Sequence, residues 1–168
     1  MPPMPVPARI AASLLGLAVL AGCSSQPSRP PTADTAAAQA RGNGFSASSV
    51  TIRALGLVGT PYRYGGNTPE SGFDCSGLVT YVFADMLDLR LPRTSRELAR
   101  VQGPKISAER LSSGDLVFFG SGDEVWHVGI YVGEGRFVHA PSSGGTVRLD
   151  ALDNPYWQRH YSGAKRVL

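Results

Sequence analysis

One thiol and two imidazoles stand in three short segments of this sequence, and together they have the composition of a cysteine-nucleophile site. The chain has two cysteines and three histidines in all, so nearly every residue suited to this chemistry lies in these segments. Cys75 would be the nucleophile, and His127 and His139 supply the imidazoles. The segments are Phe73–Val79, Trp126–Tyr131 and Phe137–Ala140. A thiol is mostly protonated at neutral pH, so the elements that hold Cys75 must help to remove its proton.

The segment around Cys75 predicts the start of a helix. Asp74 stands where a helix cap is expected, and apolar residues recur behind it at helical spacing. One row is Leu78, Val82 and Met86, and its neighbour is Val79 and Phe83. Cys75 then lies in the first turn, where the positive end of the helix dipole favours the thiolate.

The two histidines fall on segments that predict a β-hairpin. A three-residue loop at residues 133–135 places Gly129 opposite His139. His127 and His139 are then diagonal neighbours on one face, with Cβ atoms roughly 7 Å apart. One imidazole can therefore orient the other, as an activated nucleophile requires. We expect Cys75 to attack, His127 to act as general base and later as acid, and His139 to fix the tautomer of His127.

The same register divides the hairpin between two faces of the sheet. The face with the histidines carries His127, Gly129, Tyr131, Phe137 and His139. The other face is more uniformly apolar and carries Trp126, Val128, Ile130 and Val132.

Other interpretations of these residues stay open. A histidine in a strand is often only a tolerated polar residue, and Gly129 can merely ease close packing. A cysteine and two histidines are also zinc ligands, although the close pairs that usually mark a zinc site are missing and only three ligands are available. His160 is expected to be an ordinary surface residue.

The remaining elements predict the fold class. Helical spacing covers Thr51–Val58, and a helix at Thr94–Val101 has Thr94 or Ser95 as its cap. Short segments rich in Val, Ile and aromatic residues predict an antiparallel sheet. These strands are Asp115–Phe119, Trp126–Val132, Arg136–Ala140 and Thr146–Leu149. Helices followed by strands indicate an α+β fold.

The N-terminus has the layout of a secretory signal. Arg9 precedes an apolar run from Ile10 to Leu20, and small residues follow. The end of this signal resembles the bacterial lipobox, in which cleavage leaves Cys23 as a lipid-bearing first residue. Several acyl chains would hold the protein at a membrane. Ser24 behind the cysteine is similar to lipoproteins passed to the outer membrane of Gram-negative cells, so we expect the periplasmic side of that membrane.

Composition divides the chain into three parts. Residues 1–22 form the signal, and residues 23–48 form the lipidated cysteine and a flexible linker with few large apolar residues. Residues 49–168 are enough for one folded domain. The formal charge of +3 is small and scattered, which does not indicate a nucleic-acid partner. We expect a tethered monomer that needs no cofactor.

Six segments in order closely resemble the NlpC-type cell-wall cysteine peptidase family. They are Pro61–Gly66, Phe73–Val79, Leu91–Arg93, Gly114–Phe119, His127–Gly133 and Phe137–Ala140. The tail from Pro155 to Leu168 looks like the Spr (MepS)-like lipoprotein subgroup, whereas the loop between Gly66 and Asp74 is slightly longer and contains Pro69. The resemblance implies a papain-like core, in which a helix with the cysteine packs on a sheet with the histidines, and a Cys-His-His triad.

The resemblance also implies a murein endopeptidase that acts on peptidoglycan peptides. The implied bond joins D-Ala to meso-diaminopimelate, and the alternative is the bond between γ-D-Glu and diaminopimelate. Tyr62 matches a family tyrosine beside the nucleophile that holds substrate or the oxyanion, and Asp74 and Ser76 match positions that border the cleft. A non-catalytic wall-binding lipoprotein and a thiol acyltransferase acting on lipid are the alternatives from other classes.

Overall fold

The computed structural model describes residues 33–143 and 145–168. The predicted signal at 1–22, the lipid-bearing Cys23 and the first part of the predicted linker lie outside these residues. Among the described residues, no helix has the length and apolar character needed to cross a membrane.

Helix α1 spans Ala33–Gly56 and begins earlier than predicted. The apolar spacing predicted a helix only from Thr51, preceded by a flexible linker. The helix extends back through much of that linker, because this stretch is rich in alanine, the residue with the highest helix propensity. Side chains 38–45 are exposed and Val50 is the first buried one after them, so tertiary packing supports only the second half of α1. The three-part division of the chain stays a prediction.

Six strands form one antiparallel sheet in the order β3-β8-β4-β5-β6-β7. They are β3 (Lys105–Ile106), β4 (Leu116–Ser121), β5 (Glu124–Gly133), β6 (Arg136–His139), β7 (Arg148–Ala151) and β8 (Tyr161–Lys165). Strand β8 inserts between β3 and β4, although the sequence predicted no strand after Leu149. Its small residues, Ser162 to Ala164, lack the β-branched character that marks the other strands. The predicted α+β class is confirmed.

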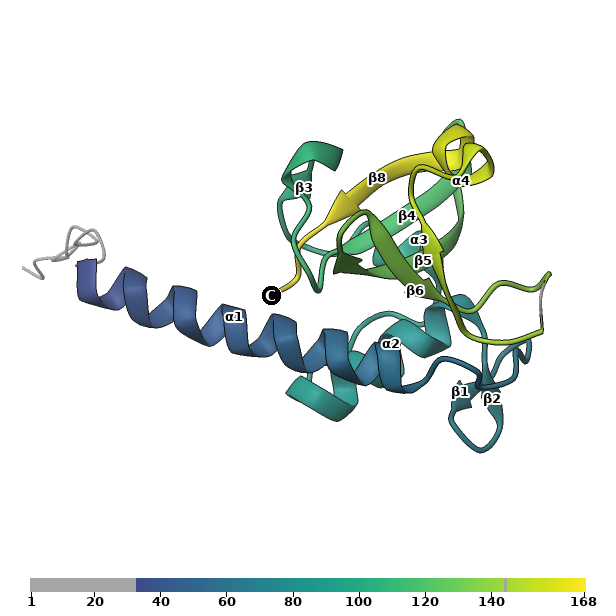
Figure 1. The fold of residues 1–168 in the computed structure, drawn as a ribbon, viewed down its shortest axis with the longest axis horizontal. Coiled ribbons are helices and arrows are strands. Elements are labelled where there is room, and N and C mark those ends of the chain that lie inside the picture. Colours follow the sequence, from purple (N-terminus) through teal and green to yellow (C-terminus); the bar gives the residue numbers. More distant parts are fainter. Residues whose placement is uncertain (1–32, 144) are drawn as a thin grey trace, which may run out of the picture. The chain divides into compact units, whose positions relative to one another are not determined.

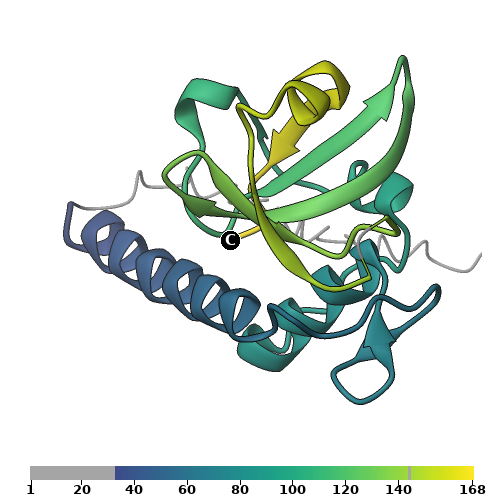
Figure 2. The same cartoon turned by 45° about the vertical axis from the view of Figure 1, so that its right-hand side comes forward.

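Helices cover the sheet on both sides. The remaining elements are β1 (Asn67–Thr68), β2 (Gly72–Phe73), α2 (Cys75–Leu87), α3 (Ser95–Leu98), the 3-10 turn η1 (Ala108–Arg110) and α4 (Pro155–His160). Helices α1 and α2 run beside each other along one side of the sheet, and α4 lies on the other side (Figures 1 and 2). Helix α3 is shorter than predicted, because Leu98 is its only buried residue, and Thr94 is its cap.

Two apolar clusters lie on opposite faces of the sheet. The cluster beside α1 and α2 includes Val50, Ala54, Leu78, Val82, Phe118, Val128, Ile130 and Val138. The cluster beside α4 is Val117, Phe119, Phe137, Trp157 and Ala164. Alternate residues of β4 and of β6 therefore face different clusters, as the period of a strand requires. Met86 was predicted to share the row of Leu78 and Val82, but it is 36% exposed in the last turn of α2.

The β5–β6 hairpin has the predicted register near the histidines but a different turn. The predicted three-residue loop is wrong. Glu134 and Gly135 form a two-residue turn with φ of 52° and 69°, the positive values typical of type I′ turns. A β-bulge just before the turn takes up the extra residue. Beyond the bulge Ile130 pairs with Val138, as in the predicted register.

Gly129 of β5 packs closely against Phe137 and His139 of β6, on the face of the sheet that carries the histidines. A Cβ atom added there would lie 2.6 Å from Cδ2 of Phe137 and 3.3 Å from Cβ of His139. The predicted neighbourhood of Gly129 and His139 is therefore confirmed, and the position has no room for a side chain.

Candidate active site

Cys75 is the first residue of α2, as its sequence segment predicted. Asp74 caps the helix: its Oδ1 accepts the N–H of Gly77 at 2.7 Å, and its Oδ2 accepts the N–H of Gly65 at 2.9 Å. The thiol is free and half-buried. The cap thus fixes the start of α2 and places Cys75 among the unpaired amides of the first turn.

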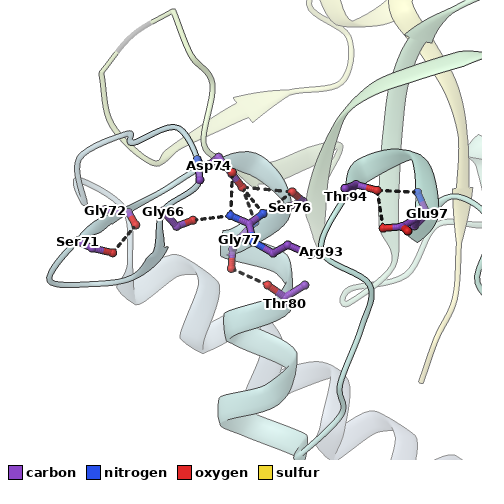
Figure 3. Close-up of polar contacts among 11 residues, drawn as sticks. Gly66, Ser71, Gly72, Asp74, Ser76, Gly77, Thr80, Arg93, Thr94 and Glu97 are labelled. Carbon is purple, nitrogen blue, oxygen red and sulfur yellow. Dashed lines mark hydrogen bonds and ion pairs between the residues drawn. The ribbon is translucent and has the colours of Figure 1, made fainter.

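Arg93 holds this start of α2 from the loop before α3 (Figure 3). Its guanidinium contacts both oxygens of Asp74, at 2.7 and 2.8 Å, and donates to Oγ of Ser76 at 2.7 Å and to the carbonyl oxygen of Gly66 at 3.1 Å. Burial raises the pKa of Asp74, but the hydrogen bonds from Arg93 and Gly77 outweigh it and leave that pKa below its ordinary value. Asp74 is therefore ionised, and its charge lies beside Cys75.

The surroundings of Cys75 oppose its ionisation. Burial raises the pKa of the thiol, the Asp74 carboxylate raises it further, and the backbone N–H groups of Val128 and Ser76 lower it by less. The resting group is therefore a thiol. This corrects the prediction that the helix start favours the thiolate, because the thiol is buried and because the residue that caps the helix is itself an anion. The contact with Val128 of β5 also brings α2 to the strand that carries His127.

The two predicted imidazoles contact each other. Nε2 of His127 lies 2.8 Å from Nδ1 of His139, and the two rings are nearly perpendicular, at 83°. His127 is 6% exposed and His139 is fully buried. Burial lowers the pKa of His127 to about 3 and that of His139 to about 4. Both rings are therefore neutral at pH 7, with one hydrogen bond between them.

Aromatic rings enclose this pair. The indole of Trp157, from α4, stacks on the ring of His127 with 5.3 Å between ring centroids. It stands edge-on to the ring of His139, with 4.9 Å between centroids. The ring centroid of Phe137 lies 4.7 Å from that of His139, and the ring centroid of Phe119 lies 6.0 Å from that of His127. These contacts exclude water from the pair, which is the cause of its lowered pKa values.

Asp150, from β7, is a partner of His139 that the sequence analysis did not find. Its Oδ2 lies 3.0 Å from Nε2 of His139. It also accepts hydrogen bonds from Nε1 of Trp157, at 2.8 Å, and from the guanidinium of Arg148, at 3.0 and 3.2 Å. The pairing of Asp150 with Phe137 of β6 could not be predicted, because a long loop joins these strands and leaves their register undefined in the sequence.

A cavity of about 330 Å³ opens over the candidate nucleophile and base. Cys75, His127 and Tyr62 all line it, whereas His139 lies behind His127. Burial and the nearby Cys75 raise the pKa of Tyr62, so its hydroxyl keeps its proton. The complete lining is Tyr62, Cys75, Trp126, His127, Ala140, Pro141, Ser142, Ser143, Arg148, Asp150, Asn154, Tyr156 and Trp157. The predicted cleft residues Asp74 and Ser76 are not in this lining, and their side chains bind Arg93 instead.

Trp126 differs from its predicted place on the apolar face. It lies at a β-bulge between β4 and β5, is 40% exposed, and lines the cavity. The bulge turns its side chain out of the alternation that buries Val128. The ring of His160 lies 5.5 Å from Trp126, and its Nδ1 lies 2.8 Å from the carbonyl oxygen of Tyr156. His160, predicted as an ordinary surface residue, is therefore half-buried against the cavity wall.

Zinc binding was the other use considered for one cysteine and two histidines. One nitrogen of each ring is already engaged in the hydrogen bond between His127 and His139. Within residues 33–143 and 145–168, no group of three or more histidine, cysteine or acidic residues is arranged to hold a metal ion.

Known proteins resemble this chain over the region just described. The model of the NlpC/P60 family matches residues 59–166. The murein DD-endopeptidase MepH of Escherichia coli is 45% identical over 117 residues, which cover 66% of this chain and 42% of MepH. The probable endopeptidase NlpC of Escherichia coli is 41% identical over 163 residues, 92% of this chain and 96% of that protein. The murein DD-endopeptidase MepS/murein LD-carboxypeptidase is 43% identical over 110 residues, 66% of this chain and 57% of MepS.

Solved structures share the fold. An NlpC/P60 family protein from Bacillus cereus has 31% identity and a TM-score of 0.67, over 71% of this chain and 39% of that one. RipD from Mycobacterium tuberculosis, described as a non-catalytic NlpC/p60 domain protein adapted to peptidoglycan binding, has 26% identity and a TM-score of 0.62, over 73% of this chain and 98% of that one. The chain thus spans less than half of MepH and of the Bacillus cereus protein but nearly the whole of RipD.

Proposed function

Because this chain belongs to the NlpC/P60 family, we propose that it is a cysteine peptidase that cleaves peptides of peptidoglycan. The observation that carries the proposal is the position of Cys75 and His127 on one cavity, with His139 hydrogen-bonded behind His127. Similarity to proteins named murein DD-endopeptidase supports the substrate class.

In the proposed reaction Sγ of Cys75 bonds to the carbonyl carbon while its proton passes to Nδ1 of His127, the ring nitrogen that His139 leaves free. His127 then gives that proton to the leaving amine as the C–N bond breaks, which leaves a thioester on the sulfur. Water attacks the thioester, His127 takes a proton from the water, and the sulfur regains it as the acid product departs. His139 orients His127 throughout, and no cofactor takes part.

Tyr62 is the proposed partner of the substrate carbonyl. Its protonated hydroxyl belongs to the cavity wall beside Cys75 and can donate a hydrogen bond to the developing oxyanion. We assign Asp74 and Ser76 a supporting role, since Arg93 binds both and holds the helix that carries the nucleophile.

The proposed bond joins D-Ala to meso-diaminopimelate, the crosslink between stem peptides. Digestion of purified muropeptides by the intact protein tests the activity and the bond together, because mass spectrometry identifies each product. The bond between γ-D-Glu and diaminopimelate would give different fragments, and these fragments alone would replace the proposed bond.

Cys75→Ala is the matched control for this digestion. Cleavage by the wild type and none by Cys75→Ala is the expected result. Identical product patterns from both proteins would remove Cys75 as the nucleophile.

Peptidoglycan binding without cleavage is a second candidate function, favoured by the likeness to RipD. The two functions separate in a sedimentation assay with insoluble cell wall. The wild type should release soluble fragments, and Cys75→Ala should bind the wall without releasing them. A wild type that sediments with the wall and releases nothing would favour the binding function.

A lipid at Cys23 and a place on the periplasmic side of the outer membrane belong to the same proposal, with the protein acting as a monomer. The lipobox-like Leu20–Cys23 supports the anchor. Mass spectrometry of the N-terminal peptide should find the acyl chains, and Cys23→Ala should move the protein out of the membrane fraction. An unmodified Cys23 in the mature protein would contradict the anchor.

A further inference from the structure

Three hydrogen-bond donors and one ring nitrogen lie around a single oxygen of the candidate site. Oδ2 of Asp150 accepts from Nε1 of Trp157 and from Nε and Nη2 of Arg148, and it lies 3.0 Å from Nε2 of His139. Neither the family motifs nor the proposed reaction uses this carboxylate. Its position is fixed by β7, which pairs with β6 so that Asp150 lies opposite Phe137 and Arg148 lies opposite His139.

Asp150 accepts at this oxygen and does not donate. The indole N–H and the guanidinium have only hydrogens to offer, so the atom they meet must supply lone pairs. Burial raises the pKa of Asp150, but the hydrogen bonds from Trp157 and Arg148, with the nearby His139, leave that pKa below its ordinary value. The carboxylate is therefore ionised at neutral pH.

The position of the proton on His139 follows from this acceptor. His139 is fully buried, so water does not reach its ring. If Nε2 lacked a hydrogen, its lone pair would face the lone pairs of Oδ2 at 3.0 Å, which is repulsive. With the hydrogen on Nε2, the same contact is attractive, although its geometry falls short of a regular hydrogen bond. His139 is therefore the Nε2–H tautomer, and its Nδ1 carries a lone pair.

The tautomer of His139 fixes that of His127. Its Nε2 lies 2.8 Å from the lone pair on Nδ1 of His139 and must donate there. A neutral imidazole has one hydrogen, so Nδ1 of His127 is left with a lone pair. This is the nitrogen that the proposed reaction needs to take the proton from Cys75. The opposite tautomers would place a hydrogen on Nδ1 of His127 and block that transfer.

We propose that Asp150 is a positioning residue that sets the tautomers of His139 and, through it, of His127. The consequence for catalysis rests on the proposed function, whereas the tautomers themselves do not. Trp157 contributes twice, since its indole N–H binds Asp150 while its ring covers both imidazoles.

Nitrogen-15 NMR of the histidine side chains tests this in the intact protein. The chain has three histidines, so the spectrum is simple. We expect the Nε2–H pattern for His127 and His139. His160 is an internal reference of the other kind, because its Nδ1 donates to the carbonyl oxygen of Tyr156 at 2.8 Å. A hydrogen on Nδ1 of His139 in the wild type would overturn the proposal with no variant needed.

Two substitutions separate the acceptor from the charge. Asp150→Ala removes the acceptor, so we expect a mixture of tautomers at both rings and a fall in kcat of about 100-fold with KM nearly unchanged. Asp150→Asn keeps an oxygen acceptor without the charge, so it should retain the Nε2–H pattern and restore kcat to within about 10-fold of the wild type. Arg148→Met removes another partner of the carboxylate and should leave both tautomers as they are.

The outcomes also separate this proposal from the proposed function. Unchanged tautomers in folded Asp150→Ala would refute the role of Asp150 even if the wild type cleaves muropeptides. The expected tautomers in a wild type that cleaves nothing would leave the role of Asp150 intact and remove the peptidase. If Asp150→Ala does not fold, the wild-type spectrum and Asp150→Asn still decide.

Discussion

At the start of α2 charged groups surround Cys75, whereas on the other side of the cavity aromatic rings surround His127. The cysteine side is partly exposed and is organised by the ion pair of Asp74 with Arg93, whose side chain is 39% exposed. The histidine side is buried and organised by Trp157, Phe137 and the hydrogen bond between two neutral rings. Burial on both sides, with the added charge of Asp74 beside Cys75, favours the uncharged forms of the thiol and of the imidazoles.

Both sides of the cavity therefore hold uncharged reacting groups before a substrate binds. The pKa of the thiol is raised and the pKa values of the imidazoles are lowered, so the proton stays on sulfur at rest. In the proposed reaction His127 therefore takes the proton during attack, and no ion pair forms beforehand. Substitutions on the two sides should also have different effects on stability, since the cysteine side depends on an ion pair and the histidine side on packing.

Removing the base should have the largest effect. His127→Ala leaves the thiol in place but takes away the acceptor of its proton, so kcat/KM should fall by roughly 10³ to 10⁴. Muropeptide hydrolysis followed by chromatography measures it. His160→Ala changes a ring outside the proposed proton path and is the control. A fall in kcat/KM of less than 10-fold in His127→Ala would mean that His127 does not take the proton from Cys75.

Removing the aromatic cover should damage the fold as well as the chemistry. Trp157 is 5% exposed, so Trp157→Ala should lower the free energy of unfolding by about 3 to 5 kcal/mol. Its neighbour Tyr156 is 46% exposed, and Tyr156→Ala should cost less than about 1 kcal/mol. Denaturant unfolding of the two variants checks this. Equal losses would show that packing around the histidines is not special.

Lowering the pH should reduce the free energy of unfolding through the two buried histidines. The folded pKa values of about 3 and about 4 lie below the value of 6.5 in the unfolded chain, so the unfolded state takes up protons first as the pH falls. The contribution of the two histidines to stability should be constant above about pH 7 and fall below about pH 6.5, by roughly 3 kcal/mol for His139 alone once the pH reaches about 4. Unfolding by urea at several pH values measures this. A double His127→Gln, His139→Gln variant should lose less stability over that range, and the same loss in both would contradict the burial of neutral rings.

Breaking the ion pair beside Cys75 should have the smallest effect on stability. Arg93→Met leaves the Asp74 carboxylate without its partner, and we expect a loss of about 1 to 2 kcal/mol, since the exposed guanidinium is partly screened by water. Arg96 makes a more exposed pair with Glu124, so Arg96→Met should change stability by less than about 0.5 kcal/mol. Thermal unfolding compares them. No difference between the two variants would show that the Asp74 network does not stabilise α2.

Local patterns made much of the site predictable. The cap at Asp74 and the first-turn position of Cys75 depend on neighbours within a few residues, and the structure has both. The contact of His127 with His139 followed from strand periodicity, and it holds although the turn differs, because the bulge compensates for the shorter loop.

Features that depend on distant contacts were not predictable. Asp150 meets His139 only through the pairing of β6 with β7, and β8 enters the sheet beside β4, far from it in sequence. The sign of the shift at Cys75 was mispredicted, because helix position alone does not include burial or the charge of the cap. The length of α1 was underestimated, because the prediction weighed apolar spacing and gave too little weight to alanine.

The protonation state of Cys75 tests the central claim most directly. The ultraviolet absorbance of a thiolate can be followed from pH 5 to pH 10, with Cys75→Ser subtracted to isolate this one sulfur. We predict no thiolate at pH 7 and a single ionisation above the ordinary cysteine value of about 8.5. A thiolate signal already present at pH 6 that disappears in His127→Ala would show a preformed ion pair and contradict the account.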